Sequence, residues 1–152
     1  MLKKDKFKQL FADIERIRRV AEAGSGKNYW EVFNAQGNLL GFAFYLEVPE
    51  TPPHTEEVAE FDKYEVWGIT NTELGLNVLE IAPHPGGPEN LWTEGVTEAG
   101  YVSQFLGLST DEMRLSPAGM IDAVTDGTIS SKLLAEAIRI QLEFMTTQIN
   151  GS

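Results

Sequence analysis

Hydroxyl-bearing residues cluster around a glycine between Ile121 and Ser131, directly before a segment with a strong helical pattern. The first-turn N–H groups of a helix have no partner within the helix, and the positive end of its dipole favours an anion. Such a junction can hold a phosphate group without any basic side chain. A threonine at this position can also form an ester with that phosphate. The same Ser and Thr residues are preferred as helix caps, a role compatible with phosphate binding.

This stretch resembles the attachment motif of the FMN-binding domain family, whose members are flavin-carrying components of Rnf-type electron-transport complexes and of sodium-translocating NADH:quinone reductases. In that family a threonine carries FMN through a phosphoester bond, and the resemblance assigns this role to Thr128. Two positions depart from the pattern, because Asp126 replaces a glycine and Gly127 replaces an alanine. A carboxylate therefore lies beside the expected phosphate. The residues that the motif assigns to the cofactor are Thr125, Asp126, Gly127, Thr128, Ile129 and Ser130, with Asp122 expected to fix the preceding turn through its own backbone bonds.

A proline- and glycine-containing segment, residues 84–92, occupies the place where the family has a loop of the type Glu-Thr-Pro-Gly-Leu-Gly that approaches the flavin. Glycines there would let backbone amides come close to the cofactor, and a tryptophan could cover its ring. The alternative is an ordinary turn followed by a core tryptophan. The residues that the resemblance assigns to this loop are Pro85, Gly86, Gly87, Leu91 and Trp92.

Composition excludes several classes of function. The absence of cysteine excludes disulfides, thiolate-bound iron–sulfur clusters and cysteine nucleophiles. The two histidines lie in proline-rich loops without a second ligand at regular spacing, so no metal site is expected, and no catalytic set of side chains stands out. A net charge of −11 disfavours nucleic acid as a partner.

Seven of the 12 basic residues lie within the first nineteen positions. They predict the solvated face of a helix, or alternatively a contact with lipid headgroups beside a removed anchor. The chain as given has neither a signal peptide nor an apolar run long enough to cross a membrane, which predicts a soluble protein.

Hydrophobic spacing predicts the structural elements. Residues 5–22 carry an apolar stripe typical of an amphipathic helix, and residues 47–62 read as an exposed loop. Alternating and β-branched residues predict strands at 29–33, 39–46, 63–70 and 76–82, which pair as two hairpins. A helical pattern at 93–106 ends near Gly107. The last helix, from Thr128 to about residue 148, is expected to bury Leu133, Leu134, Ala137, Ile138, Leu142 and Met145.

These elements predict a single α+β domain over residues 1–152, with a twisted antiparallel sheet of about four or more strands packed by helices. The resemblance implies an FMN-binding electron carrier rather than a stand-alone enzyme. It also implies other subunits of a membrane electron-transfer complex as partners, an FMN transferase for attachment, and a location on the outer side of a bacterial cytoplasmic membrane. The alternative is a flavin-free ligand-sensing or protein-interaction module on the same fold, which the departures at Asp126 and in the proline-glycine loop favour.

Overall fold

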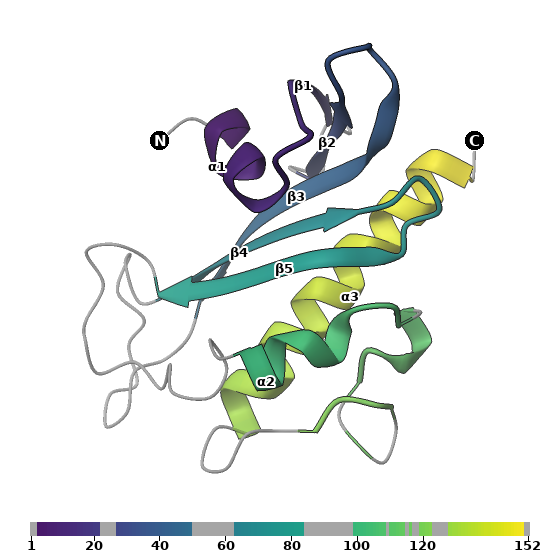
Figure 1. Ribbon diagram of the computed structural model, residues 1–152. Helices are drawn as coiled ribbons and strands as arrows, with labels where there is room; N and C mark the ends of the chain where they lie inside the picture. The colour runs from purple at the N-terminus through teal and green to yellow at the C-terminus, as the bar shows by residue number, and fades with distance from the viewer. Residues whose placement is uncertain are drawn as a thin grey trace.

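The chain folds around one antiparallel sheet whose five strands follow each other in chain order, β1-β2-β3-β4-β5 (Figure 1). The computed structural model describes residues 3–21, 27–49, 63–83, 99–108, 110–114, 116, 119–122 and 128–150. An α-helix precedes the sheet and a helical region follows it, which confirms the predicted α+β architecture. The strands are β1 (Arg16–Ala21), β2 (Asn28–Phe33), β3 (Leu39–Pro49), β4 (Lys63–Thr70) and β5 (Leu76–Pro83).

Both predicted hairpins are confirmed, and the same local device closes each of them. The side-chain oxygen of Asn34 accepts hydrogen bonds from the backbone N–H groups of Gln36 and Asn38, at 3.0 and 2.9 Å. In the β4–β5 turn, Asn71 accepts equivalent bonds from Glu73 and Gly75, each 2.9 Å long. An asparagine that bonds its own following backbone favours a turn without help from the rest of the fold.

The predicted helix over 5–22 is wrong in its second half. The helix α1 (Lys3–Leu10) ends early, and β1 follows it as an edge strand with Ile17 opposite Val32 of β2. A three-residue spacing between Ile17 and Val20 fits a helical stripe, but both residues are β-branched and suit a strand equally well. Backbone pairing with β2, which the local pattern does not reveal, decides between the two.

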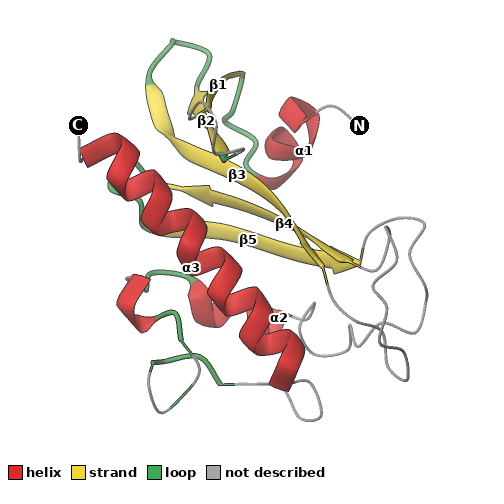
Figure 2. Cartoon of the chain, turned by 180° about the vertical axis from the view of Figure 1, so that it is seen from behind, coloured by secondary structure: helices red, strands yellow, loops and turns green. Residues whose placement is uncertain are grey.

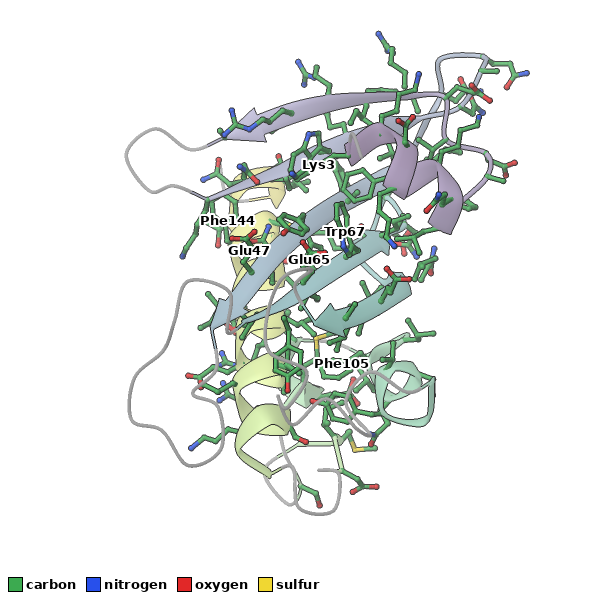
Figure 3. The ribbon with its side chains drawn as sticks, turned by 90° about the vertical axis from the view of Figure 1, so that its left-hand side faces the viewer. Lys3, Glu47, Glu65, Trp67, Phe105 and Phe144 are labelled. Carbon is green, nitrogen blue, oxygen red and sulfur yellow. The ribbon has the colours of Figure 1, made fainter. Side chains whose placement is uncertain are left out.

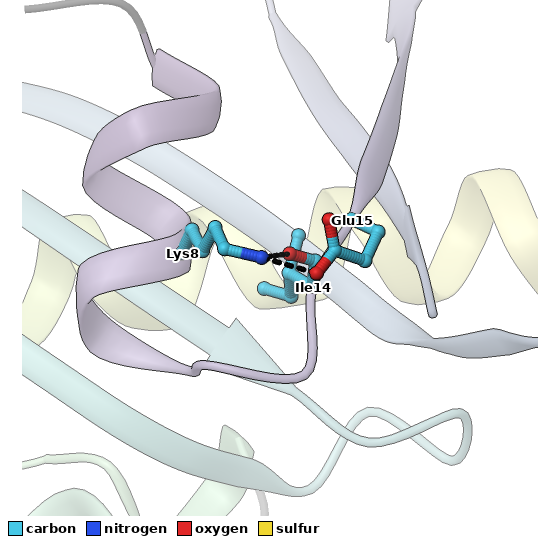
Figure 4. Close-up of polar contacts among 3 residues, drawn as sticks. All are labelled: Lys8, Ile14 and Glu15. Atoms are coloured by element: carbon cyan, nitrogen blue, oxygen red, sulfur yellow. Dashed lines mark hydrogen bonds and ion pairs between the residues drawn. The ribbon is translucent and has the colours of Figure 1, made fainter. Parts of the chain in front are cut away.

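A polar contact closes the chain reversal between α1 and β1 (Figure 4). The ammonium of Lys8 donates a hydrogen bond to the backbone carbonyl of Ile14, 3.1 Å away, and also pairs with the carboxylate of Glu15. This pairing lowers the pKa of Glu15, chiefly through the hydrogen bond from Lys8. A lysine expected on a solvated helix face thus ties the end of α1 to the start of β1.

Two further predicted boundaries change. Strand β3 extends to Pro49, so residues 47–49 belong to the sheet, while residues 50–62 of the predicted loop lie outside the described residues. Within the predicted helical region 93–106, the described part contains α2 (Ala99–Val102) and a 3-10 helix, η1 (Ser103–Phe105). Gly107 follows with a φ of +80°, which fits its expected role as a stop.

Both faces of the sheet are covered, because α3 (Thr128–Asn150) packs on one face and α1 on the other (Figure 2). Alternation along β4 sends Tyr64 and Val66 into the core under α3, and Trp67 and Ile69 into the core under α1. The predicted inward face of α3 is confirmed for Leu134, Ile138, Leu142 and Met145, whereas Ala137 is only partly buried and Leu133 is 36 % exposed. The fully or almost fully buried residues of α3 are Ser131, Leu134, Ala135, Ile138, Gln141, Leu142 and Met145.

A long final helix does not imply a membrane segment. In the described part of the chain, no helix combines the length and the apolar character that crossing a membrane requires.

Candidate functional site

The predicted phosphate site maps to the beginning of α3. Thr128, Ile129 and Ser130 form the first turn of this helix, as predicted for a phosphate-binding helix start. The other residues assigned to the cofactor lie outside the described residues; they are Thr125, Asp126, Gly127, Pro85, Gly86, Gly87, Leu91 and Trp92. The structure therefore describes the residues on either side of the motif, which are Ile121 and Asp122 before it and Ser131 after it.

The downstream flank is held by a buried tyrosine. The hydroxyl of Tyr101, in α2, donates a 2.9 Å hydrogen bond to the backbone carbonyl of Ser131 in the first turns of α3. Both residues are almost completely buried, and the ring of Tyr101 packs edge-on against Phe105 with 5.5 Å between centroids. Burial raises the pKa of Tyr101 and outweighs the opposite effect of the hydrogen bond, so the hydroxyl stays a neutral donor at physiological pH.

The upstream flank is held by a side chain from the neighbouring turn. Gln104, in η1, accepts a 2.7 Å hydrogen bond from the backbone N–H of Asp122 and donates a 3.1 Å bond to its carbonyl. The bonds that Asp122 is expected to make to the backbone of its own turn stay a prediction, because residues 123–127 lie outside the described residues. Just before it, Ile121 is fully buried, and its N–H donates a 3.0 Å bond to the carbonyl of Arg114.

The segment formed by α2 and η1 thus contacts the chain on both sides of residues 123–130. The same segment begins at Ala99, a few residues after the predicted proline-glycine loop, and Gly107 beyond it bonds back to Leu76 of β5 at 3.2 Å. Figure 1 shows α2 beside the first turns of α3. The fold consequently brings residues 99–105, which follow the predicted proline-glycine loop in the sequence, next to both flanks of the threonine motif.

The charge of the helix start suits an anion. The first turn of α3 contains no acidic side chain that would neutralise the positive end of the helix dipole. Sequence reasoning missed the two residues that hold this site together. Neither Tyr101 nor Gln104 belongs to a motif, so only their positions in space, beside Ser131 and Asp122, could reveal these contacts.

Comparison with known proteins finds no family model that matches this chain and no matching curated protein. The assignment of a function therefore depends on the motif before α3 and on the geometry of its flanks.

Proposed function

We propose that this chain is an FMN-binding electron-transfer domain, in which residues 125–130 hold the flavin phosphate and Thr128 is the residue to which it is esterified. Its setting would be a membrane-associated redox complex of the Rnf type, on the outer side of a bacterial cytoplasmic membrane. The partners are the other subunits of that complex and an FMN transferase. When bound, FMN supplies transfer of one or two electrons.

The hydrogen bond from Tyr101 to Ser131 carries this proposal. It joins the helical segment that follows the proline-glycine loop to the helix that begins with the threonine motif. In the resembling family the loop and the threonine motif share the flavin, so a bond between the segments that follow them supports a common site. The two-point contact between Gln104 and Asp122 gives the same support from the other side of the motif.

The chain's own groups would bind and orient the cofactor. The first N–H groups of α3, which have no partner within the helix itself, are suitable donors to phosphate oxygens, and no carboxylate in that turn opposes the charge. Gln104 and Tyr101 would keep the ends of the motif at a constant separation, which lowers the entropy lost when a ligand is bound. The glycines at 86 and 87 would let the backbone of the preceding loop come close to the flavin.

The proposal is tested by co-expressing the chain with an FMN transferase and measuring the intact mass. The wild type is expected to gain the mass of one FMN less one water and to keep its yellow colour after denaturation. Thr128→Ala should abolish the gain, whereas Thr147→Ala, an exposed threonine near the other end of α3, should retain it. A wild type that stays unmodified and colourless would contradict the proposal.

The second candidate is a flavin-free ligand-sensing or protein-interaction module on the same fold. The observation that favours it is Asp126, which places a carboxylate beside the expected phosphate, where two like charges repel by about 1 to 4 kcal/mol at the dielectric of a protein surface. Replacing Asp126 by Gly separates the candidates. If the wild type remains unmodified while Asp126→Gly accepts FMN, the cofactor was lost through this substitution and the module is the better description.

A further inference from the structure

A second group of chemically distinctive side chains lies on the opposite face of the sheet, under α1 and far in sequence from Thr128. The ammonium of Lys3 lies over the faces of three aromatic rings, 4.5 Å from the centroid of Tyr45, 5.8 Å from Trp30 and 5.9 Å from Trp67. The three rings come from β2, β3 and β4, and Tyr45 and Trp67 face each other across the β3–β4 pair with centroids 4.4 Å apart. They form one aromatic site that Lys3 borders through all three rings, while the ammonium of Lys6 lies over Trp67 alone, 5.8 Å from its centroid.

Two carboxylates adjoin this aromatic site. Glu47 and Glu65 are direct partners across β3 and β4, and the alternation of the strands puts them on the same face as Tyr45. Figure 3 shows the two glutamates with Lys3 and Trp67. Like charges placed directly opposite each other destabilise a sheet. The hydroxyl of Tyr45 lies 2.7 Å from Glu47 Oε2 and 2.9 Å from Glu65 Oε2, but its single proton can be donated to only one of them at a time. The two carboxylates therefore give this side of the aromatic site a negative charge, which favours a cation.

The way Lys3 is held indicates which cation fits best. Within the described part of the chain, its ammonium makes no hydrogen bond or ion pair, and the interactions that it does make are with the faces of the three rings. A primary ammonium has three N–H donors, and ring faces do not satisfy them, so they must bond to water. A quaternary ammonium has none to satisfy, and aromatic faces are the usual means of binding it.

The geometry also allows Lys3 to leave without unfolding α1. Phe7, one turn further along the helix, is completely buried and packs against Trp30 and Trp67 with centroids 5.5 and 5.6 Å away. Phe7 therefore anchors the helix, while Lys3 is the first described residue of the helix and is only partly buried. Withdrawal of the Lys3 side chain would vacate the position that its ammonium occupies beside the three rings.

We propose that Trp30, Tyr45 and Trp67, with Glu47 and Glu65 beside them, form a binding site for a trimethylammonium group, and that Lys3 occupies this site until such a ligand displaces it. This proposal is independent of flavin binding, because it concerns the other face of the sheet.

The test uses choline and its neutral carbon analogue, 3,3-dimethylbutan-1-ol, titrated into the ¹⁵N-labelled protein while the indole N–H signals are followed by NMR. Choline is expected to shift the signals of Trp30 and Trp67 saturably, and the neutral analogue to shift them far less. Trp92, which lies outside the described residues, supplies a third indole signal for comparison. Equal shifts with both compounds, or no saturable shift with choline, would overturn the proposal.

Variants separate a specific site from a general effect of charge. Lys3→Ala removes the competing internal cation and should strengthen choline binding about two- to fivefold, the range expected for one exposed cation–π contact. Lys4→Ala removes an equal charge from an exposed neighbour and should leave the affinity unchanged. Glu65→Gln should weaken binding. An identical affinity for Lys3→Ala and Lys4→Ala would contradict displacement, and circular dichroism verifies that each variant is folded.

The trimethylammonium group occurs both in free solutes and in lipid headgroups. Sedimentation of Lys3→Ala with phosphatidylcholine vesicles distinguishes the two sources. If the variant binds to the vesicles and free choline abolishes this binding, the ligand is the lipid headgroup. Saturable binding of choline without sedimentation assigns it to a free solute.

Discussion

Gly68 of β4 lies directly opposite Phe44 of β3, and the phenyl ring covers the position where a side chain at 68 would stand. A Cβ added to Gly68 would lie 2.3 Å from Phe44 Cζ, far inside van der Waals contact. Phe44 is completely buried in the core under α3, so the ring has little room to move away. The absence of a side chain at 68 is thus a packing requirement of this core.

Gly68→Ala is therefore expected to destabilise the protein by about 1 to 3 kcal/mol through overpacking, measured by urea unfolding. Phe44→Leu removes the ring that would clash, so it should recover part of the loss in the double variant. A coupling of about 0.5 to 3 kcal/mol between the two changes would establish that the clash is the cause. Strictly additive effects would place the cause in the backbone of β4 instead.

Tyr101→Phe removes the hydroxyl that bonds to Ser131 while it keeps the ring in the core. We expect a loss of about 1 kcal/mol in the free energy of unfolding, because a buried carbonyl loses a partner. Tyr29→Phe is the matched control, since the Tyr29 hydroxyl makes no hydrogen bond within the part of the chain that the structure describes. Equal losses in the free energy of unfolding for the two variants would show that the Tyr101 hydrogen bond does not contribute to stability.

Ile138 and Ile140 lie on the same helix but in opposite environments, with 0 % and 40 % of their surface exposed. Ile138→Ala should destabilise the protein by about 2 to 5 kcal/mol, because it leaves a cavity between α3 and the sheet. Ile140→Ala should change stability by no more than about 0.5 kcal/mol. Denaturant unfolding of both variants tests whether α3 presents the face with Ile138 to the sheet, and a reversed order of the two losses would show that it does not.

Stability is expected to fall at alkaline pH. Burial raises the pKa of Tyr101, and the pKa of Tyr45 is raised by burial and by its two neighbouring carboxylates. Since tyrosine in the unfolded chain ionises near pH 10, the unfolded state loses these protons first. The protonated tyrosines therefore make their full contribution to the free energy of unfolding below about pH 10, and this contribution is lost as the pH rises above that value.

Urea unfolding between about pH 8 and pH 11 measures this dependence. Tyr101→Phe removes one of the two groups, so its stability should decline less steeply above about pH 10 than that of the wild type. The comparison cancels the contribution of the lysines, which are common to both proteins. Parallel curves for the two proteins would mean that Tyr101 ionises equally in the folded and unfolded states.

Gln104→Met is expected to lower FMN loading in the presence of the transferase, because it removes both hydrogen bonds that hold Asp122 before the motif. The methionine side chain has a similar length and retains the packing of the Gln104 stem. Intact mass gives the modified fraction, and hydrogen exchange of the Asp122 amide should become faster in the variant. Faster exchange with unchanged loading would show that this contact positions the turn but not the attachment site.

Local interactions explain why much of the sheet and the last helix could be predicted. Asn34 and Asn71 close the turns that they begin, so each hairpin is encoded within a few residues of its turn. The helix from Thr128 is long enough for its apolar spacing to be unmistakable, although the neighbours of Leu133 leave that residue exposed. The role of the hydroxyl-rich motif before it stays a prediction, because residues 123–127 lie outside the described residues.

Tertiary contacts decided the remaining features. The spacing of Ile17 and Val20 is compatible with a helix and with a strand, and only pairing with β2 makes it an edge strand. The bond between Tyr101 and Ser131 joins residues 30 positions apart, and the aromatic site around Lys3 gathers side chains from α1 and three strands. Local periodicity reports which face of an element is apolar, but which distant groups meet depends on how the elements pack, and that is a property of the whole chain.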